Sequence, residues 1–201
     1  MKVNSVSKAT LGRLPKYLEF LKSTSLDNIS SAVVARELGL GEVQVRKDLG
    51  SVCDKGKPKI GYLKKDLIKS IEICIGKDTT TNAVLIGAGK LGQALLDYKG
   101  FEDFGVHIVS AFDINEALIS ENKRISPMSE LEATCKLQNI QIGIVAVSAS
   151  SAQEVCDLLV SYGIRAIWNF APCEISVPND VIFVQENLAL SLAHLKNKLV
   201  N

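Results

Sequence analysis

A glycine-rich turn between an apolar run and an amphipathic segment constrains the fold of this chain most. Residues 82–86 have the apolar composition of a buried strand, and Gly-Ala-Gly-Lys-Leu-Gly follows at once. This pattern, placed where a strand turns into a helix, is typical of Rossmann domains that bind dinucleotides. Its glycines permit the sharp bend, the approach of a pyrophosphate and close helix–strand packing. The expected contacts with the cofactor are Gly87, Ala88, Gly89, Lys90, Leu91 and Gly92.

An aspartate follows the next predicted strand, where Rossmann domains bind the adenosine ribose. Residues 107–112 predict that strand, and Asp113 lies 21 residues beyond Gly92. A carboxylate about 20 residues past the last glycine binds the ribose 2′-hydroxyl. The same carboxylate would repel a 2′-phosphate, so the sequence favours NAD(H) over NADP(H).

Further apolar runs predict a parallel sheet with crossover helices. Strands are expected at residues 140–147, 166–170 and 181–184, and a helix at 150–162. Buried parallel strands have uninterrupted apolar sequences, and ligands bind at the carboxyl ends of such strands. This rule adds Val147, Ser148, Asn169 and Phe170 to the expected cofactor site.

The last predicted helix, residues 186–198, has an apolar stripe that no later element can cover. The stripe consists of Leu188, Leu192, Leu195 and Leu199, at helical spacing. The helix therefore packs back on its own sheet or docks against a second subunit, and the pattern alone does not decide between these arrangements.

Charge divides the chain into two parts, which we expect to be two domains, 1–78 and 79–201. Residues 1–76 carry 14 Lys and Arg against 8 Asp and Glu, whereas residues 77–201 carry 9 against 14. A basic domain joined to an acidic one indicates different partners, and the basic domain is suited to a polyanion.

The basic part predicts a helix-turn-helix followed by a β-wing. Helices are expected at 31–38 and 42–49, joined by a Gly-Leu-Gly turn. An earlier helix would have Pro15 in its first turn, and Gly50 would end the third helix. The segment 55–62 has three lysines between glycines, which is typical of a wing that contacts phosphates.

The helix at 42–49 has the pattern of a recognition helix. Val45 and Leu49 would face the core, which leaves four polar residues nearer solvent: Gln44, Arg46, Lys47 and Asp48. Long polar donors on such a face reach base edges or phosphates, and glutamine can recognise adenine. Expected DNA contacts are therefore Gln44, Arg46 and Lys47, with Lys57 and Lys59 from the wing.

Composition excludes several classes of protein. The five cysteines form no CxxC pair, so we expect buried reduced thiols and no metal site. No apolar run reaches the length of about 18 residues that spans a membrane, and the N-terminus lacks the apolar core of a signal peptide, so a cytoplasmic location is expected. The two histidines, His107 and His194, fall away from the expected crevice, and no substrate domain remains. A small NAD-dependent dehydrogenase is thus the weakest alternative.

Six segments together resemble the Rex family of redox-sensing transcriptional repressors, over nearly the whole chain. They are Arg13-Leu14-Pro15 with Tyr17-Leu18, Gln44–Leu49, Gly61-Tyr62, Gly87–Gly92, Phe112-Asp113 and Asn169–Pro172. The resemblance implies an α/β protein with an N-terminal winged helix-turn-helix domain, a Rossmann domain, and a terminal helix exchanged in a homodimer. It also implies that double-stranded operator DNA is bound and then released when NADH binds.

The resemblance adds residues to both sites. It places Arg13, Gly61 and Tyr62 at the DNA and Tyr98 near the nicotinamide. Glu19 stands where the family usually has an arginine, and Ala189 where it usually has an aspartate of an interdomain contact. A DNA-binding regulator that senses another adenine nucleotide therefore stays an alternative. The usual Tyr-Phe-Gly after the recognition helix is Ser51-Val52-Cys53 here.

Overall fold

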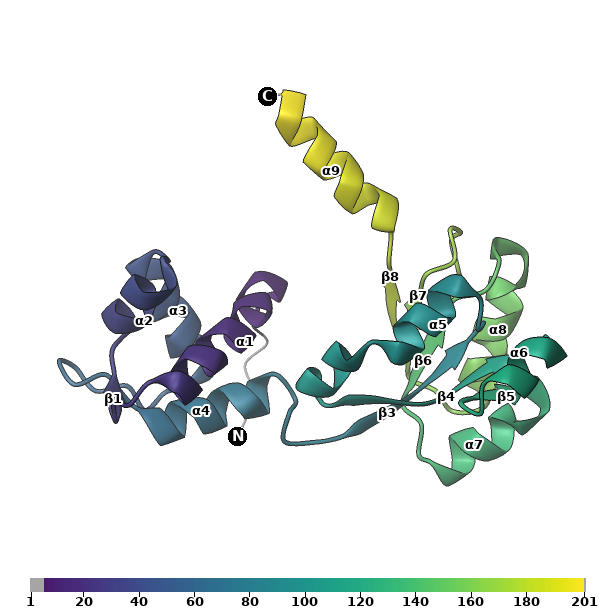
Figure 1. The fold of residues 1–201 in the computed structure, drawn as a ribbon, viewed down its shortest axis with the longest axis horizontal. Coiled ribbons are helices and arrows are strands. Elements are labelled where there is room, and N and C mark those ends of the chain that lie inside the picture. Colours follow the sequence, from purple (N-terminus) through teal and green to yellow (C-terminus); the bar gives the residue numbers. More distant parts are fainter. Residues whose placement is uncertain (1–5, 201) are drawn as a thin grey trace. The chain divides into compact units, whose positions relative to one another are not determined.

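The computed structural model describes residues 6–200 and separates them into two compact units, one ending at Thr80 and one beginning at Thr81 (Figure 1). The N-terminal unit is helical, with one small sheet. Its elements are α1 (Lys8–Ser23), β1 (Asn28–Ile29), α2 (Ser31–Leu38), α3 (Glu42–Val52), β2 (Tyr62–Leu63) and α4 (Lys64–Cys74). β1, just before α2, pairs antiparallel with β2, at the end of the wing. This small sheet therefore joins the wing to the helix-turn-helix.

In the N-terminal unit, two helix boundaries differ from the predicted ones. α1 begins at Lys8, because the hydroxyl of Ser7 caps it by accepting from the Thr10 N–H at 3.1 Å, so Pro15 lies inside the helix. α3 continues past Gly50 to Val52, since Gly50 does not take the left-handed conformation that ends a helix. Gly39, with φ +65°, does end α2 in that way.

Asp48 is buried, which corrects the expectation that it lies near solvent. Only 4% of this residue is exposed. Its Oδ2 accepts hydrogen bonds from Arg13 Nε at 2.7 Å and the Tyr17 hydroxyl at 2.8 Å. Its Oδ1 accepts from Arg13 Nη2 at 2.9 Å and the Thr10 hydroxyl at 3.1 Å. The carboxylate thus joins α3 to α1 across the centre of the unit.

Opposing effects set the ionisation of this cluster. Burial tends to raise the pKa of Asp48, but the hydrogen bonds from Arg13, Tyr17 and Thr10 outweigh it, so that this pKa lies below its usual value. Burial and the hydrogen bond to Asp48 raise the pKa of Tyr17 to about 12. Asp48 is therefore charged and Tyr17 neutral at neutral pH.

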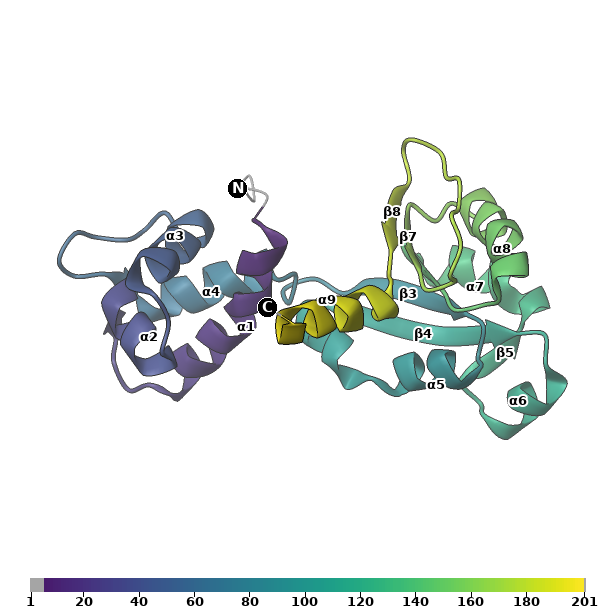
Figure 2. The same cartoon turned by 90° about the horizontal axis from the view of Figure 1, so that it is seen from above.

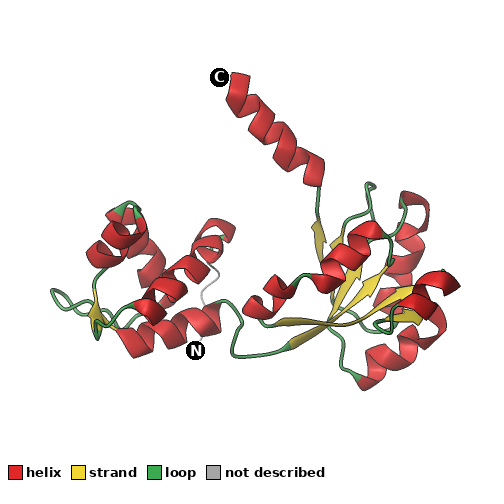
Figure 3. Cartoon of the chain, in the orientation of Figure 1, coloured by secondary structure: helices red, strands yellow, loops and turns green. Residues whose placement is uncertain are grey.

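The C-terminal unit is a Rossmann sheet of six parallel strands (Figure 3). Its strands are β3 (Thr81–Ile86), β4 (Val106–Asp113), β5 (Ile125–Pro127), β6 (Ile142–Val145), β7 (Ala166–Asn169) and β8 (Ile182–Gln185). The order β5-β4-β3-β6-β7-β8 reverses direction between β3 and β6, the position where ligands of such sheets bind.

Helices cover both faces of the sheet. They are α5 (Lys90–Asp97), α6 (Glu116–Glu121), α7 (Leu131–Leu137) and α8 (Ala149–Ser161), with short 3₁₀ segments at Lys99–Phe104 and Met128–Glu130. Each face of the sheet has its own hydrophobic core, and alternate residues of β3 point into one or the other. Val84 packs with α7 and α8, while Leu85 packs with α5. The Lys99–Phe104 segment packs on the α5 side through Phe101.

The last helix, α9 (Leu188–Val200), extends from β8 with its apolar stripe uncovered (Figure 2). Leu188, Leu192, Leu195 and Leu199 are 59%, 70%, 56% and 83% exposed. Within residues 6–200, no helix is long and apolar enough to cross a membrane. All five cysteines are free, three of them buried, and the described residues contain no cluster of His, Cys, Asp or Glu suited to a metal ion.

Asp48→Asn is expected to destabilise the N-terminal unit by about 3 kcal/mol, because it leaves the guanidinium of Arg13 without its counter-charge. Since folding lowers the pKa of Asp48, its stabilisation is present above the ordinary aspartate pKa of 3.8 and is lost as the pH falls through the lower folded value. Urea unfolding followed by circular dichroism should show an advantage of the wild type over Asp48→Asn that is constant near neutral pH and shrinks as the pH falls below 3.8. The only tryptophan, Trp168, lies in the other unit and provides the control signal. An advantage independent of pH would contradict this account.

Candidate cofactor crevice and DNA-binding face

The three glycines after β3 meet different surroundings. Gly87 has φ +94°, and a β-carbon there would lie 2.6 Å from the carbonyl oxygen of Ala146. A β-carbon at Gly92 would lie 1.9 Å from the carbonyl oxygen of Gly87. A β-carbon at Gly89 would meet nothing within 4 Å. The fold itself therefore requires Gly87 and Gly92, whereas Gly89 leaves open space beside the backbone at the start of α5.

Asp113, at the end of β4, is bound to the glycine turn. Its Oδ2 accepts from the Ala88 N–H at 2.6 Å, and its Oδ1 accepts from the Asn115 N–H at 2.9 Å. Each carboxylate oxygen thus has one backbone donor and keeps further acceptor capacity. These bonds orient the carboxylate beside the turn before any ligand binds.

A cavity of about 500 Å³ lies at the carboxyl ends of β3, β4 and β6. It brings together five of the predicted cofactor residues: Gly87, Gly89, Asp113, Val147 and Ser148. Sequence reasoning missed Ile114, which is 86% exposed, and Met128, both of which line the same cavity. The position of Ile114 directly after the predicted acidic residue was the available signal.

Both helices that begin at this cavity present uncapped ends to it. α5 starts after Gly89 and α8 after Ser148, and neither has a side-chain cap or an acidic residue in its first turn. The hydroxyls of Ser148 and Ser150 lie 2.9 Å apart at the start of α8. Free N–H groups and the positive ends of helix dipoles attract anions, so the cavity suits a pyrophosphate.

Seven of the twelve predicted cofactor residues lie outside the lining of this cavity: Ala88, Lys90, Leu91, Gly92, Tyr98, Asn169 and Phe170. Ala88 is buried and contributes its N–H to Asp113, while Lys90 and Leu91 are exposed on the first turn of α5. Asn169 is fully buried, and its amide bonds Ala171 and the side chain of Gln185. The expectation that Asn169 faces a cofactor is corrected: its side-chain amide instead bonds Ala171 in the turn after β7 and the side chain of Gln185 on β8.

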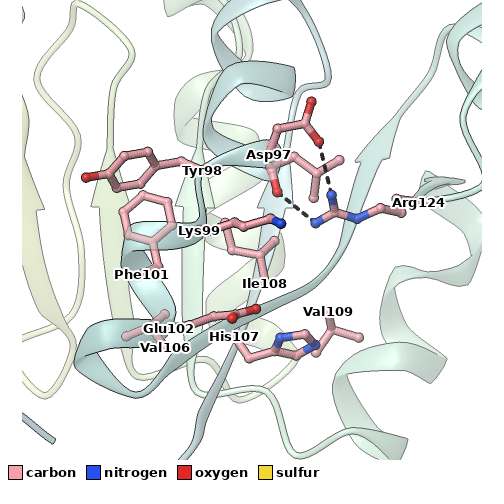
Figure 4. A pocket seen from close by; sticks show the side chains of 11 residues that line it. Asp97, Tyr98, Lys99, Phe101, Glu102, Val106, His107, Ile108, Val109 and Arg124 are labelled. Atoms are coloured by element: carbon pink, nitrogen blue, oxygen red, sulfur yellow. Dashed lines mark hydrogen bonds and ion pairs between the residues drawn. The ribbon is translucent and has the colours of Figure 1, made fainter. Parts of the chain in front are cut away.

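Tyr98 lies at the far end of α5, away from the glycine turn. Figure 4 shows it with Phe101 at a cavity of about 540 Å³, which Asp97, bound to Arg124 at 3.1 Å, also lines. Aromatic contacts continue from Tyr98 to Phe101 at 5.0 Å and from Phe101 to Trp168 at 5.8 Å. A row of rings therefore leads from Tyr98 towards β7.

That row ends at Phe170, whose ring lies 4.5 Å from that of Trp168. Phe170 also lines a third cavity of about 930 Å³, formed with β8 and the start of α9. The structure therefore connects Tyr98 and Phe170 to each other but places neither of them at the glycine turn.

The predicted DNA residues cluster on α3 and the wing. Gln44, Arg46 and Lys47 are exposed on α3, and Lys57 and Lys59 are exposed on the wing. Arg46, Lys57, Lys59, Gly61 and Tyr62 line one shallow cavity of about 340 Å³ between α3 and the wing. Gly61, with φ +87°, is required because a β-carbon would lie 2.3 Å from the Ile29 carbonyl oxygen. Arg46 also pairs with Glu42.

Arg13 is mostly engaged within the unit, although it was predicted to contact DNA. Besides its two bonds to Asp48, it faces the side-chain amide of Gln44. A guanidinium only donates hydrogen bonds, so the Gln44 oxygen must be the atom that faces it. That oxygen accepts from Nη2 at 2.9 Å and Nη1 at 3.2 Å. Thr10 and Tyr17 complete this cluster. Sequence reasoning missed Thr10 and gave Tyr17, part of the Rex resemblance, no role.

A winged helix-turn-helix unit joined to a Rossmann unit defines a class of DNA-binding regulators with a nucleotide-type sensor fold. Residues 78–173 match the family model described as CoA binding domain, and residues 5–50 match the one described as putative DNA-binding protein N-terminus. The two models therefore fall on the two units separately.

Curated relatives match nearly the whole chain. The redox-sensing transcriptional repressor Rex of Clostridium botulinum (strain Alaska E43 / Type E3) is 39% identical over 200 residues, covering 96% of this chain and 95% of the relative. The repressor Rex of Treponema denticola is 42% identical over 189 residues, covering 91% of this chain and 90% of the relative. The chain belongs to the Rex family of redox-sensing transcriptional repressors. Its similar relatives are repressors rather than enzymes.

Solved structures agree. The crystal structure of RSP in complex with β-NAD⁺ and operator DNA has a TM-score of 0.82 and 34% identity, covering 98% of this chain and 93% of that one. The crystal structure of RSP in complex with β-NADH has a TM-score of 0.75 and 33% identity, covering 98% of this chain and 95% of that one. The α/β fold with a winged helix-turn-helix unit and a parallel Rossmann sheet is thus confirmed.

Gly92→Ala is expected to lower the free energy of unfolding of the C-terminal unit by about 1–3 kcal/mol, because α5 must move away from the Gly87 carbonyl. Gly89→Ala should cost less than about 1 kcal/mol, the scale of an altered helix cap. Thermal unfolding followed by Trp168 fluorescence compares the two matched variants. Equal losses of unfolding free energy in the two variants would contradict the claim that the fold requires Gly92 but not Gly89.

Proposed function

We propose that this protein is a transcriptional repressor that binds operator DNA through its N-terminal unit and NAD(H) through its C-terminal unit, with NADH favouring release. The observation that carries the proposal is the open space at Gly89 beside the oriented carboxylate of Asp113. Support also comes from the relative solved with β-NAD⁺ and operator DNA and, separately, with β-NADH. A cytoplasmic location follows from these two proposed ligands.

In this proposal the cofactor binds along the carboxyl edge of β3, β4 and β6. The free N–H groups at the start of α5, after Gly89, would hold the pyrophosphate, and Asp113 would accept from the adenosine ribose. Ile114, exposed beside Asp113, would cover the adenine. NAD(H) supplies two redox forms, of which only the oxidised nicotinamide is positively charged. Burying that charge costs free energy, so the two forms favour different environments.

The nicotinamide end would lie towards Phe170. Val147 and Ser148 at the end of β6 would border it, and Tyr98 would lie near it. The row of aromatic contacts from Tyr98 through Phe101 and Trp168 towards Phe170 supports that arrangement.

The DNA would be bound by α3 in the major groove, with the wing on the flanking backbone. Arg46 and Lys47 would supply donors to bases and phosphates, and Lys57 and Lys59 would contact phosphates. Arg46 would exchange its partner Glu42 for the DNA, since that pair is exposed and therefore worth little. The cavity between α3 and the wing would follow the sugar-phosphate edge.

A homodimer would connect the two activities. The uncovered stripe of α9 would dock against the second subunit, and two recognition helices would then meet half-sites about one DNA turn, or a multiple of it, apart. A ligand can change DNA affinity only if it binds two arrangements of the dimer differently. A change of subunit angle between NADH-bound and NAD⁺-bound forms would move the recognition helices out of register.

The direct test titrates NADH and NAD⁺ at fixed total nucleotide into the protein bound to duplexes that it has selected from a random library. NADH should release the DNA and NAD⁺ should not. If NADH binds and the DNA stays bound, the sensor function is wrong; if ADP alone reproduces the release, the ligand is another adenine nucleotide.

Asp113→Ala is expected to weaken NADH binding by about tenfold, in line with the loss of one charge-assisted hydrogen bond. DNA affinity without cofactor should stay unchanged. Asp113→Asn, which keeps an acceptor for the Ala88 N–H, separates support of the turn from contact with the ribose. Calorimetry with NADH gives the affinities. Loss of DNA binding in the cofactor-free variant would contradict these separate roles.

Leu195→Glu is expected to dissociate the dimer, because it places a charge in the centre of the proposed interface. Sedimentation should show a monomer, and operator affinity should fall. Lys196→Glu adds the same side chain one position along the helix and serves as the matched control. A Leu195→Glu protein that remains dimeric would exclude α9 as the interface.

A further inference from the structure

We infer that Gln44 recognises operator DNA as a hydrogen-bond donor only, and therefore selects guanine or thymine at its position rather than adenine. The inference rests on the proposed role of α3 in binding DNA. Gln44 is the third residue of α3 and is exposed, at the end of a recognition helix that contacts base edges. Within the sequence of α3 it is the only residue with an amide side chain.

Arg13 occupies the oxygen of the Gln44 amide. The two guanidinium nitrogens Nη2 and Nη1 lie 2.9 and 3.2 Å from that oxygen. An amide oxygen has two lone pairs, so these two donors use its acceptor capacity. The NH₂ group of Gln44 is then the only part left for DNA, and it carries donors alone.

Arg13 cannot easily turn away from this position. Its Nε and Nη2 also donate to the buried carboxylate of Asp48 at 2.7 and 2.9 Å, and its side chain is only 24% exposed. The planar guanidinium is therefore fixed at one edge by Asp48 while its other edge faces Gln44. Arg13 thus acts as a positioning residue that sets which atoms of Gln44 point outward.

The chemistry of the major groove then determines the base. A glutamine that pairs with adenine uses its oxygen for N6 and its NH₂ for N7. With the oxygen engaged, adenine would leave its N6 donor unmatched. Guanine offers N7 and O6 as acceptors, and thymine offers O4, so both match a donor-only side chain. The adenine contact expected from the sequence is thereby replaced.

Gln44→Glu tests the inference, because the substituted carboxylate keeps an oxygen for Arg13 but presents only an acceptor to DNA. Full-length wild-type and variant proteins select duplexes from a random library, which are then sequenced. We expect one position per half-site to change from guanine or thymine to cytosine or adenine, with about a tenfold change in relative affinity. Lys59→Gln lowers the charge equally and should weaken binding without changing that preference.

Two outcomes would overturn the inference. The first is a wild-type preference for adenine at the position that Gln44→Glu alters, and the second is a preference that Gln44→Glu leaves unchanged everywhere. Failure of the proposed function is distinct, because the wild-type protein would then enrich no sequence. Gln44 is exposed, so its variant keeps the fold.

Arg13→Lys is the second variant. Lysine keeps a charge for Asp48 but lacks the fork that holds the Gln44 oxygen, so adenine should become acceptable at the same position. A purely structural role of Arg13 would lower the melting temperature and leave the base preference as it is. That result would contradict the positioning role.

Discussion

The approach of α5 to the turn after β3 is the contact on which the C-terminal unit depends. Gly92 faces the carbonyl of Gly87 so closely that no side chain fits there. Gly87, where the chain bends, has no room for a side chain either, because the carbonyl of Ala146 directly after β6 lies against it. These two contacts bring the start of α5 to the carboxyl edge of the sheet. The result is a cavity with free N–H groups, an oriented carboxylate at Asp113 and unfilled space at Gly89, the combination that a dinucleotide needs.

The N-terminal unit depends in the same way on the buried carboxylate of Asp48. Its bonds to Arg13 and Tyr17 fix α3 on α1, so that the exposed face of α3 is held as one rigid surface. The polar cluster that stabilises the unit also sets the orientation of Gln44. Stability and base recognition therefore share the same residues in this unit.

Periodicity and motifs predicted the elements whose signals are local. The glycine turn, the strand ending at Asp113, α2 and the start of α3 lie where the sequence placed them. Contacts distant in the chain could not be predicted. Asp48 lies between the core positions of α3, but its burial is possible only because Arg13 supplies a charge from 35 residues away. Asn169 likewise lies at a loop predicted to bind the ligand, yet its side-chain amide hydrogen-bonds to partners as far along the chain as Gln185, 16 residues further on.

The central claim is that one chain couples operator DNA to the oxidation state of a nicotinamide cofactor, and thermodynamic linkage tests it most directly. If NADH weakens DNA binding by some factor, DNA must weaken NADH binding by the same factor. The measurement is the NADH dissociation constant of the wild-type protein, alone and saturated with its selected operator. The account predicts that operator DNA raises this constant by the factor with which NADH weakens DNA binding. An NADH affinity that DNA leaves unchanged would contradict it.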